Sequence, residues 1–497
     1  MHSIRSRVAL CVFSLFLATP ALALTWHPNV PDQSFNNGLV YVDRFAAPSS
    51  HNMVSERMVM LGNGDVVVAG RVTYLNPTDP ANPMWLGLVR YNAAGQRVTW
   101  GSGPDTTYTY FNRQYVIYPK GSAARFTRVA DIIEYGNFLY VLAEGPASVG
   151  GGQRNVSVIV FRQSDGEFQG IYNAFARSED EYGAGLVAID AAFNVRYLLA
   201  IGTKVSASGV QRPTFRRFNL NASTGGLTED NSIDPGNGGY RDLVFPDVFC
   251  NTGACSGSAY AVKSFGGGAF RLGIYVGGTL LPNSGITEFL LLKVKLDGSL
   301  DNGFNGNGMK RVSASDANIN PDGMGYVYDV AVVPGSQADA ATDRVYALAS
   351  RDDDVLIESS IAKVHGDGTL DPAFGYIGKG YASVGLNRAR SIVVIGNDIV
   401  VGGQKNYGGP NPLAALAVVD ANLSNPLNSQ PIYITPYAAK RADGSVWGAS
   451  IFYDMAVRSG SRLVATGDVR DDSAGGTLMF GTVGIVVDKI FANGFEQ

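Results

Sequence analysis

The sequence predicts an all-β protein, a seven-bladed β-propeller built from four-stranded antiparallel blades. Glycine occupies 61 of 497 positions and only 16% of residues are charged, a balance that favours short strands and tight turns over long helices. Short apolar runs bounded by turn-forming residues recur along the chain. One kind of run appears seven times, and a repeated four-stranded sheet buries both of its faces only when it packs in a ring of similar sheets.

The recurring run is rich in Val, Ile, Leu and Tyr and ends in small residues. Its seven copies end at Gly70, Gly145, Gly202, Gly278, Ser350, Gly403 and Gly467. A terminal Ala or Gly lets one backbone approach another closely, as a crowded interior requires. The copies lie 53 to 76 residues apart, whereas a minimal blade needs roughly 40–45 residues. The surplus predicts long loops near residues 71–83, 101–113, 228–268 and 421–450.

Each clear run has strand-like neighbours. Residues 57–61 precede the first run across Gly62-Asn63-Gly64, which is a strong hairpin signal. A third apolar strand follows most runs, at residues 86–92, 156–163, 289–296, 360–366 and 413–420. In the clearest units this strand leads into an Asp-Gly turn and then into Leu-Asp-x-x-Phe, as at Asp297–Phe304 and Asp367–Phe374.

This phrase resembles the delta-60 repeat family. In that family an Asp-Gly turn precedes an apolar strand ending in Ala-Gly, and an Arg/Lys-aromatic strand and Gly-Ser-Leu-Asp-x-x-Phe-Gly follow. The segments that match best are Leu61–Gly70, Arg90–Gly95, Asp297–Gly308 and Asp367–Gly380. The resemblance implies a β-propeller, and it implies no particular biochemical role.

The repeat is offset against the ends of the chain. Asp32, Phe35 and Gly38 repeat the tail of the phrase without its beginning, while the last unit stops near residues 492–496. The offset predicts that residues 24–497 form a single domain in which both chain ends complete one sheet. Such pairing would close the ring and remove open strand edges.

The first 23 residues have the pattern of a secretory signal peptide. Arg5 and Arg7 precede the apolar stretch Val8–Ala18, and Ala21-Leu22-Ala23 is a small-x-small cleavage site. Cys11 lies inside the apolar stretch after Leu10, which disfavours a lipoprotein. No later segment is apolar for 18 residues, so we expect no membrane span and a secreted or periplasmic protein.

Cleavage near Ala23 leaves 37 basic and 43 acidic residues, a net charge of −6. This balance argues against nucleic acid as a partner, because binding a phosphate backbone depends on clustered positive charge. Cys250 and Cys255 are then the remaining cysteines, and in an oxidising compartment they are predicted to form a local disulfide. The alternative is a pair of metal ligands, but no His or second Cys pair stands nearby.

The sequence predicts no catalytic residue, no cofactor and no metal site. The histidines after cleavage, His27, His51 and His365, lack motif spacing, and no Gly-x-Ser-x-Gly elbow is present. Oxygen-rich segments at Asp316–Gly323 and Asp301–Asn307 fail the EF-hand pattern and are read as turns. Tyr108, Tyr110, Phe111, Tyr115 and Tyr118 form an aromatic cluster that suits either strands or a sugar- or protein-binding face.

We therefore expect an exported, non-catalytic propeller that acts as a binding or surface-interaction module, with a glycan or an envelope or surface protein as its partner. The alternative is a secreted polysaccharide hydrolase or lyase whose loop carboxylates, at Asp352–Asp354 and Asp471–Asp472, lie at one face of the ring. The last residues resemble a short Ile/Leu-Phe-x-x-Gly-Phe-Glu ending of exported proteins of some gammaproteobacteria. The interpretation that we favour for these residues is a final hairpin turn, and a processing or sorting signal is the alternative.

The offset of the repeat yields a first test. Deletion of residues 24–45 should lower the melting temperature by many degrees, because the last sheet would lose the strand that closes the ring. Thermal unfolding followed by circular dichroism measures the change. An unaltered melting temperature would contradict closure by the N-terminal segment.

Overall fold

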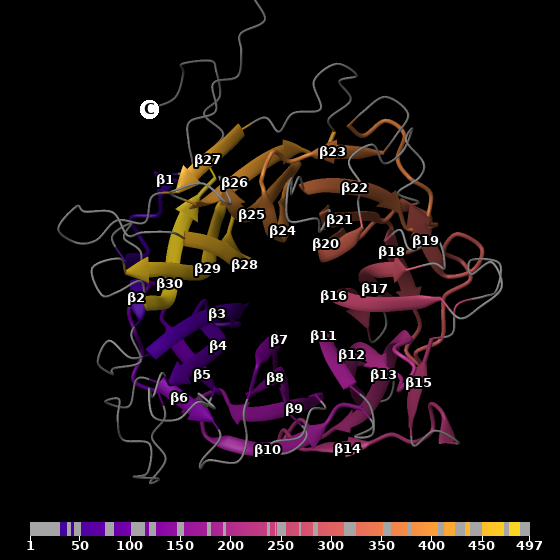
Figure 1. The fold of residues 1–497 in the computed structure, drawn as a ribbon, viewed down its shortest axis with the longest axis horizontal. Helices are drawn as coiled ribbons and strands as arrows, with labels where there is room; N and C mark the ends of the chain where they lie inside the picture. Colours follow the sequence, from indigo (N-terminus) through magenta and orange to yellow (C-terminus); the bar gives the residue numbers. More distant parts are fainter. Residues whose placement is uncertain are drawn as a thin grey trace, which may run out of the picture.

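Seven antiparallel sheets stand around a common axis, as Figure 1 shows, and this arrangement confirms the predicted seven-bladed propeller. The computed structural model describes residues 30–487 apart from connecting segments, the longest of which are 101–114, 313–324, 423–432 and 438–449. We number the blades 1 to 7 in chain order, beginning with the sheet of β3 to β6.

The innermost and second strands of the blades form long hairpins. The innermost strands are β3 (His51–Met60), β7 (Arg128–Tyr135), β11 (Asp180–Asp190), β16 (Ser256–Gly267), β20 (Tyr326–Val333), β24 (Arg388–Ile395) and β28 (Ser450–Ser459). The second strands, which contain the recurring runs, are β4 (Val66–Tyr74), β8 (Phe138–Pro146), β12 (Arg196–Val205), β17 (Phe270–Leu281), β21 (Arg344–Ser350), β25 (Asp398–Lys405) and β29 (Arg462–Asp471).

The two outer strands complete each blade. The third strands are β5 (Met84–Tyr91), β9 (Arg154–Arg162), β13 (Gln211–Leu220), β18 (Glu288–Val294), β22 (Ser359–His365), β26 (Leu413–Asp420) and β30 (Thr477–Val486). The fourth strands are β6 (Tyr115–Tyr118), β10 (Phe168–Asn173), β14 (Leu227–Glu229), β19 (Met309–Val312), β23 (Tyr381–Ser383) and β27 (Tyr433–Tyr437). In blade 3 a further strand, β15 (Tyr240–Asp242), also pairs with β13.

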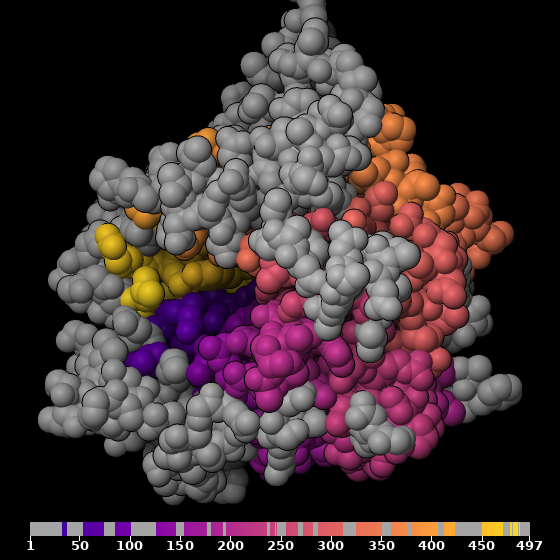
Figure 2. Space-filling view, turned by 45° about the vertical axis from the view of Figure 1, so that its right-hand side comes forward, coloured from indigo at the N-terminus to yellow at the C-terminus, as the bar shows by residue number. Residues whose placement is uncertain are grey.

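The ring closes through blade-to-blade packing. Each innermost strand contacts the innermost strand of the next blade, and β28 of blade 7 contacts β3 of blade 1. In Figure 2 the C-terminal blade (yellow) lies directly beside the first blade (indigo). The buried apolar residues of the described chain form seven clusters, and each cluster fills the junction between two neighbouring blades. The core of this fold is therefore divided among the junctions.

Segments from both ends of the described chain build blade 7. Strands β1 (Val30–Pro31) and β2 (Tyr41–Asp43) both pair with β30. Between them, Asp32 accepts a hydrogen bond from Arg458 at 3.0 Å, and the ring of Phe35 is fully buried. Burial alone would raise the pKa of Asp32, but hydrogen bonds from Ser34 and the charges of Arg462 and Arg458 hold it below the ordinary value. N-terminal residues thus supply the outer part of the last blade.

The predicted loop at 228–268 is wrong for much of its length. Strand β16 occupies residues 256–267, and β15 lies within the same range. Residues 71–74 likewise belong to β4, and β27 lies inside 421–450. The Gly- and Ser-rich composition of β16 hid the strand, yet Gly257 is required there because an added Cβ would overlap the ring of Phe245.

Small residues in the second strands face a common feature of the innermost strands. Every innermost strand has a shift in register typical of a β-bulge. The residues paired with the position just before the bulge are Gly70, Ala143, Gly202, Gly278, Ala349, Gly403 and Gly467. An added Cβ at Gly467 would overlap the carbonyl oxygen of Ile451, so the small residue makes room for the bulged backbone.

A cation on the third strand links several blades and accounts for the Arg/Lys of the repeated phrase. Lys293 donates to the carbonyl of Gly366 in the next blade at 3.1 Å, and its ammonium group lies 3.8 Å from Asp301 of its own blade. Lys363 donates in the same way to Ala421 at 3.0 Å. Arg90 of blade 1 and Arg217 of blade 3 make the equivalent bonds to Gln163 and Leu296.

Substitution of Gly467 tests the role of the small residue. Gly467→Ala should destabilise the protein by roughly 1–3 kcal/mol, because the new methyl group overpacks the bulge of β28. Gly62→Ala is the control, since the nearest atoms to its new Cβ are carboxylate oxygens 4.0 Å away. Urea unfolding of both variants provides the comparison. Equal stability of the two would show that the bulge does not need a small partner.

Candidate functional site

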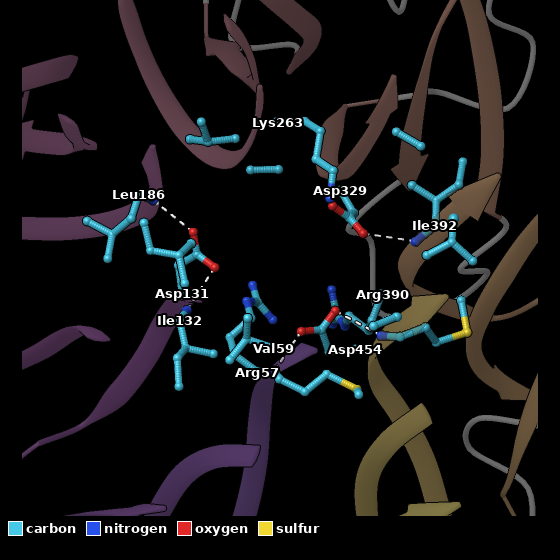
Figure 3. A pocket seen from close by; sticks show the side chains of 18 of the residues that line it. Arg57, Val59, Asp131, Ile132, Leu186, Lys263, Asp329, Arg390, Ile392 and Asp454 are labelled. Atoms are coloured by element: carbon cyan, nitrogen blue, oxygen red, sulfur yellow. Dashed lines mark hydrogen bonds between the residues drawn. The ribbon is translucent and has the colours of Figure 1, made fainter. Parts of the chain in front are cut away.

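A cavity of about 580 Å³ lies at the centre of the ring and is lined by residues of the innermost strands. Its lining includes four carboxylates, Asp131, Glu134, Asp329 and Asp454, and three basic side chains, Arg57, Lys263 and Arg390. All of these except Glu134 are labelled in Figure 3, and those six come from six different blades. Because these residues are far apart in sequence, only closure of the ring brings them together.

Each innermost strand has a bulge beside this cavity, and most of the bulge residues and of the residues that follow them line it. The bulge residues are Glu56, Ala130, Ala184, Tyr260, Tyr328, Arg390 and Tyr453. The residues that follow them are Arg57, Asp131, Gly185, Ala261, Asp329, Ser391 and Asp454. We call the first set the bulge layer.

The three carboxylates join neighbouring blades. Asp131 accepts from the N–H of Ile132, beside it, and from the N–H of Leu186 in the next blade, each at 2.8 Å. This N–H belongs to the innermost edge of its sheet, where no further strand offers an acceptor. The Asp131 carboxylate therefore satisfies a backbone donor that the ring geometry leaves without a strand partner.

The same arrangement recurs at Asp329 and Asp454. Asp329 accepts from the N–H of Ile392 in the next blade at 2.9 Å, and Asp454 accepts from the N–H of Met58 at 2.8 Å. Each carboxylate also accepts from the residue that follows it, at 2.8 Å. The hydroxyl of Ser391 accepts from the N–H of Met455 at 3.2 Å, so blade 6 uses a hydroxyl where blades 2, 5 and 7 use a carboxylate.

Basic side chains alternate with these acids. The guanidinium of Arg57 donates to the carbonyl of Ala130 at 2.7 Å and to that of Glu56 at 2.8 Å, which holds it at the centre of the view in Figure 3. The guanidinium of Arg390 lies 4.2 Å from the ring centre of Tyr328. Lys263 extends toward Asp329 in Figure 3.

Burial and like charge shift the pKa values of the carboxyls. Burial raises the pKa of Asp131 to about 6, against hydrogen bonds from Leu186 and Ile132 and the charge of Arg57. It also raises the pKa of Asp454 to about 6, with the charge of Asp329 acting in the same direction. The pKa of Asp329 is also raised, mainly by burial, although the positive charge of Lys263 opposes this change.

A second group of charges surrounds Glu56 of the bulge layer, where blades 7, 1 and 2 meet. Glu56 pairs with Arg71 at 3.0 Å and accepts from the N–H of Val129 at 2.5 Å. Burial nevertheless raises the pKa of Glu56. Asp468 of β29 is 5% exposed, and burial followed by the charge of Glu56 raises its pKa well above the ordinary value.

Tyrosines concentrate on one side of the bulge layer. The ring centres of Tyr326 and Tyr328 lie 6.3 Å apart in a stacked arrangement. Tyr260 of the preceding blade lies 5.9 Å from Tyr326 and 6.5 Å from Tyr328. Tyr453 of blade 7 also lines the cavity, whereas blades 2 and 3 contribute the methyl groups of Ala130 and Ala184.

The acidic loop residues predicted from the sequence are not brought into this cavity by any described contact. Asp352–Asp354 and Asp472 lie outside the described residues, and Asp471 ends β29 without a described side chain. Cys250 lies outside the described residues and Cys255 is buried, so the disulfide stays a prediction.

The remaining candidates are distributed over the molecule. Asp316–Gly323, Tyr108, Tyr110 and Phe111 lie outside the described residues, as does His27. Tyr115 and Tyr118 end β6, and His51 begins β3, without described side chains. His365 ends β22, with its Nε2 atom 4.0 Å from Asp371. In the segment 301–307, Asp301 accepts from the N–H of Gly303 and Asn307 from that of Met309, which are turn contacts.

Sequence reasoning missed the central acids, although a signal for them exists. An apolar residue, then Ala or Tyr, then Asp and an apolar residue recur at 129–132, 327–330 and 452–455. Each copy begins shortly after the start of an innermost strand. Read alone, an Asp in an apolar strand indicates a turn or an error of strand assignment; its recurrence indicates a shared position in the ring.

Among the described residues, no three His, Cys, Asp or Glu side chains gather as metal ligands. No described helix combines the length and apolar character needed to cross a bilayer.

Fold and site together define a β-propeller with a polar central cavity. Residues 274–304, from β17 to Phe304, match a family described as a domain of unknown function (DUF5122) β-propeller. No curated protein sequence is significantly similar to the chain.

Solved propellers of several kinds are similar in fold at low identity. Extracellular domains 1–2 of Drosophila semaphorin 1a are 10% identical, with 91% of this chain and 88% of that chain covered and a TM-score of 0.42. The α-L-arabinofuranosidase Arb93A of Fusarium graminearum is 11% identical, with 93% of this chain and 98% of that chain covered and a TM-score of 0.37. A leech intramolecular trans-sialidase is 9% identical, with 90% of this chain and 71% of that chain covered and a TM-score of 0.36.

The raised pKa values predict how stability depends on pH. A carboxyl whose pKa is higher in the folded than in the unfolded protein binds more protons when folded, so stability falls as pH rises from about 4 to about 6. Carboxyls whose pKa is lowered in the folded protein, such as Asp32 and Asp371, have the opposite effect. The stability that they contribute is lost only when the pH falls below about 4 and they become protonated. We therefore expect a melting temperature a few degrees higher at pH 5 than at pH 7.5.

The Asp131→Asn/Asp454→Asn double variant is the control, because it removes both titrating groups. Its melting temperature should be lower throughout, since an amide cannot accept both backbone bonds, and its change between pH 7.5 and pH 5 should be smaller. A wild-type melting temperature that falls between pH 7.5 and pH 5 would contradict the assignment.

Proposed function

We propose that the protein is an exported, non-catalytic propeller of the delta-60 repeat type that binds its ligand in the central cavity. The observation that carries this proposal is the use of Asp131, Asp329 and Asp454 as blade-to-blade acceptors. A general acid needs a proton to transfer, and a nucleophile needs an oxygen that is free to move and form a bond with the substrate. Here both oxygens of each carboxylate accept backbone N–H bonds, which suits a rigid binding wall.

The ligand class that we propose is a glycan or an envelope or surface protein of the exporting cell. Export through the signal peptide at residues 1–23 and a disulfide between Cys250 and Cys255 belong to the same proposal. The cavity supports it, because pockets of about 300–1,000 Å³ with a few convergent polar groups are typical ligand sites.

A polysaccharide hydrolase is the second candidate. The pKa values of Asp131 and Asp454, near 6, favour it because a general acid needs a pKa close to the working pH. In a second form of this proposal, the loop carboxylates Asp352–Asp354 carry out the hydrolysis in place of the central acids. Release of reducing ends from a polysaccharide panel, and its loss in Asp131→Asn or in Asp352→Asn, would replace the binding proposal by this one.

Binding in the cavity can be tested by narrowing it. Val59 lines the cavity on β3, and Val59→Trp should abolish saturable binding to immobilised glycans or purified envelope components without release of products. Val195→Trp is the matched control, because Val195 is 39% exposed in the hairpin turn of blade 3. Both variants are first compared with the wild type by circular dichroism. Equal binding by folded Val59→Trp and wild type would place the ligand elsewhere.

A further inference from the structure

The charges gathered beside the bulges are balanced. Three carboxylates and three basic groups line the cavity there, so this part of the lining carries no net charge. The fourth carboxylate, Glu134, lies farther along β7 and accepts hydrogen bonds from the N–H of Gly62 and the side chain of Gln163. A ligand with a net charge would add an uncompensated charge to a partly dehydrated site, which is costly. The lining therefore favours a ligand that is neutral overall and rich in groups that both donate and accept hydrogen bonds.

The acceptors and donors of the site are held in place before a ligand arrives. Each cavity carboxylate is fixed by two backbone N–H groups, and each of its oxygens has a further lone pair. The guanidinium of Arg390 lies over the ring of Tyr328 and lines the cavity, and a guanidinium group carries five N–H donors. A hydroxyl group complements both, because it donates to a carboxylate and accepts from a guanidinium.

The aromatic side chains of the bulge layer lie on one side of the cavity, and small side chains lie on the other. Tyr260, Tyr328 and Tyr453 line the cavity from blades 4, 5 and 7, while Ala130 and Ala184 stand at the same positions of blades 2 and 3. Tyr326 packs against two of these tyrosines and holds their rings. Aromatic rings offer apolar faces at low entropic cost, and a saturated ring with an apolar C–H face and polar edges fits against them.

We propose that the central cavity binds an uncharged sugar residue of a glycan, with its ring against the tyrosine side and its hydroxyls shared between the Asp carboxylates and Arg390. This inference rests on the proposed function and narrows the ligand to one chemical class. The wall of small residues on blades 2 and 3 leaves room for the sugar ring opposite the tyrosines. The cavity volume suits one or a few sugar residues at the end of a chain.

Titration calorimetry with matched oligosaccharides tests the chemical class. The neutral probes are cellotriose, maltotriose, xylotriose and mannotriose, and the charged probes are trigalacturonate and the glucosamine trimer. At least one neutral probe should bind, with an affinity at least tenfold higher than that of either charged probe. Failure of every neutral probe, or preference for a charged one, would overturn the inference. Binding of a charged probe that Val59→Trp abolishes would still leave cavity binding as the function.

Variants of the cavity wall test the placement of the ring. Tyr328→Ala and Arg390→Ala should each weaken binding at least tenfold, and Tyr328→Phe, which keeps the ring, should weaken it much less. The controls are Phe168→Ala and Arg196→Ala, which remove an exposed aromatic side chain and a surface arginine outside the cavity. If Tyr328→Ala does not fold, Tyr328→Leu replaces it. Wild-type affinity in the folded Tyr328 and Arg390 variants would refute the assigned site.

Discussion

The constraint on which this structure depends is the unpaired inner edge of each sheet. Seven innermost strands expose backbone N–H groups toward the axis, where no further strand offers a carbonyl. The protein supplies acceptors from the side chains of the preceding blade, as Asp131 does for Leu186 and Asp454 does for Met58. Leaving such a donor unsatisfied costs about 1–3 kcal/mol, so each carboxylate stabilises the ring despite the cost of its own burial. The same contacts set the spacing between neighbouring blades.

The repeated phrase follows from the same need to join blades at several radii. Near the axis, a bulge and a Gly or Ala opposite it, such as Gly467, bring two backbones close together. Farther out, a third-strand cation such as Lys293 reaches the carbonyl of Gly366 in the next blade, and Asp301 of its own blade balances its charge. Phe304 of the same phrase is fully buried and lies 5.9 Å from Tyr275. Each residue type that recurs in the phrase therefore has a contact that recurs in the structure.

Much of the fold could be predicted from the sequence because its signals are local and repeated. Apolar runs ending in small residues, hairpin turns such as Gly62–Gly64 and third strands such as 289–296 each need only neighbouring residues to form. Strand β16 escaped prediction because its glycines and serines, which are needed for close packing, look like a loop. The central cavity escaped for a different reason: Arg57 and Asp454 become neighbours only when the ring closes. No local sequence pattern specifies the distance between these two residues, and the acidic segments favoured by density are not the residues that line the described cavity.

A ring of equivalent positions also explains how a repeated scaffold acquires a specific site. Every blade has a bulge residue and a following residue, and the backbone requires only that some neighbour accept the free N–H. Blade 6 meets that requirement with Ser391, so the carboxylates of the other blades exceed the structural minimum. The bulge residues are less constrained still, since Ala130 and Tyr328 occupy the same position of different blades. Differences among blades at these positions therefore cost the fold little. The clustering of tyrosines on one side is where the ring departs from its own symmetry, as the proposed binding of an asymmetric ligand requires.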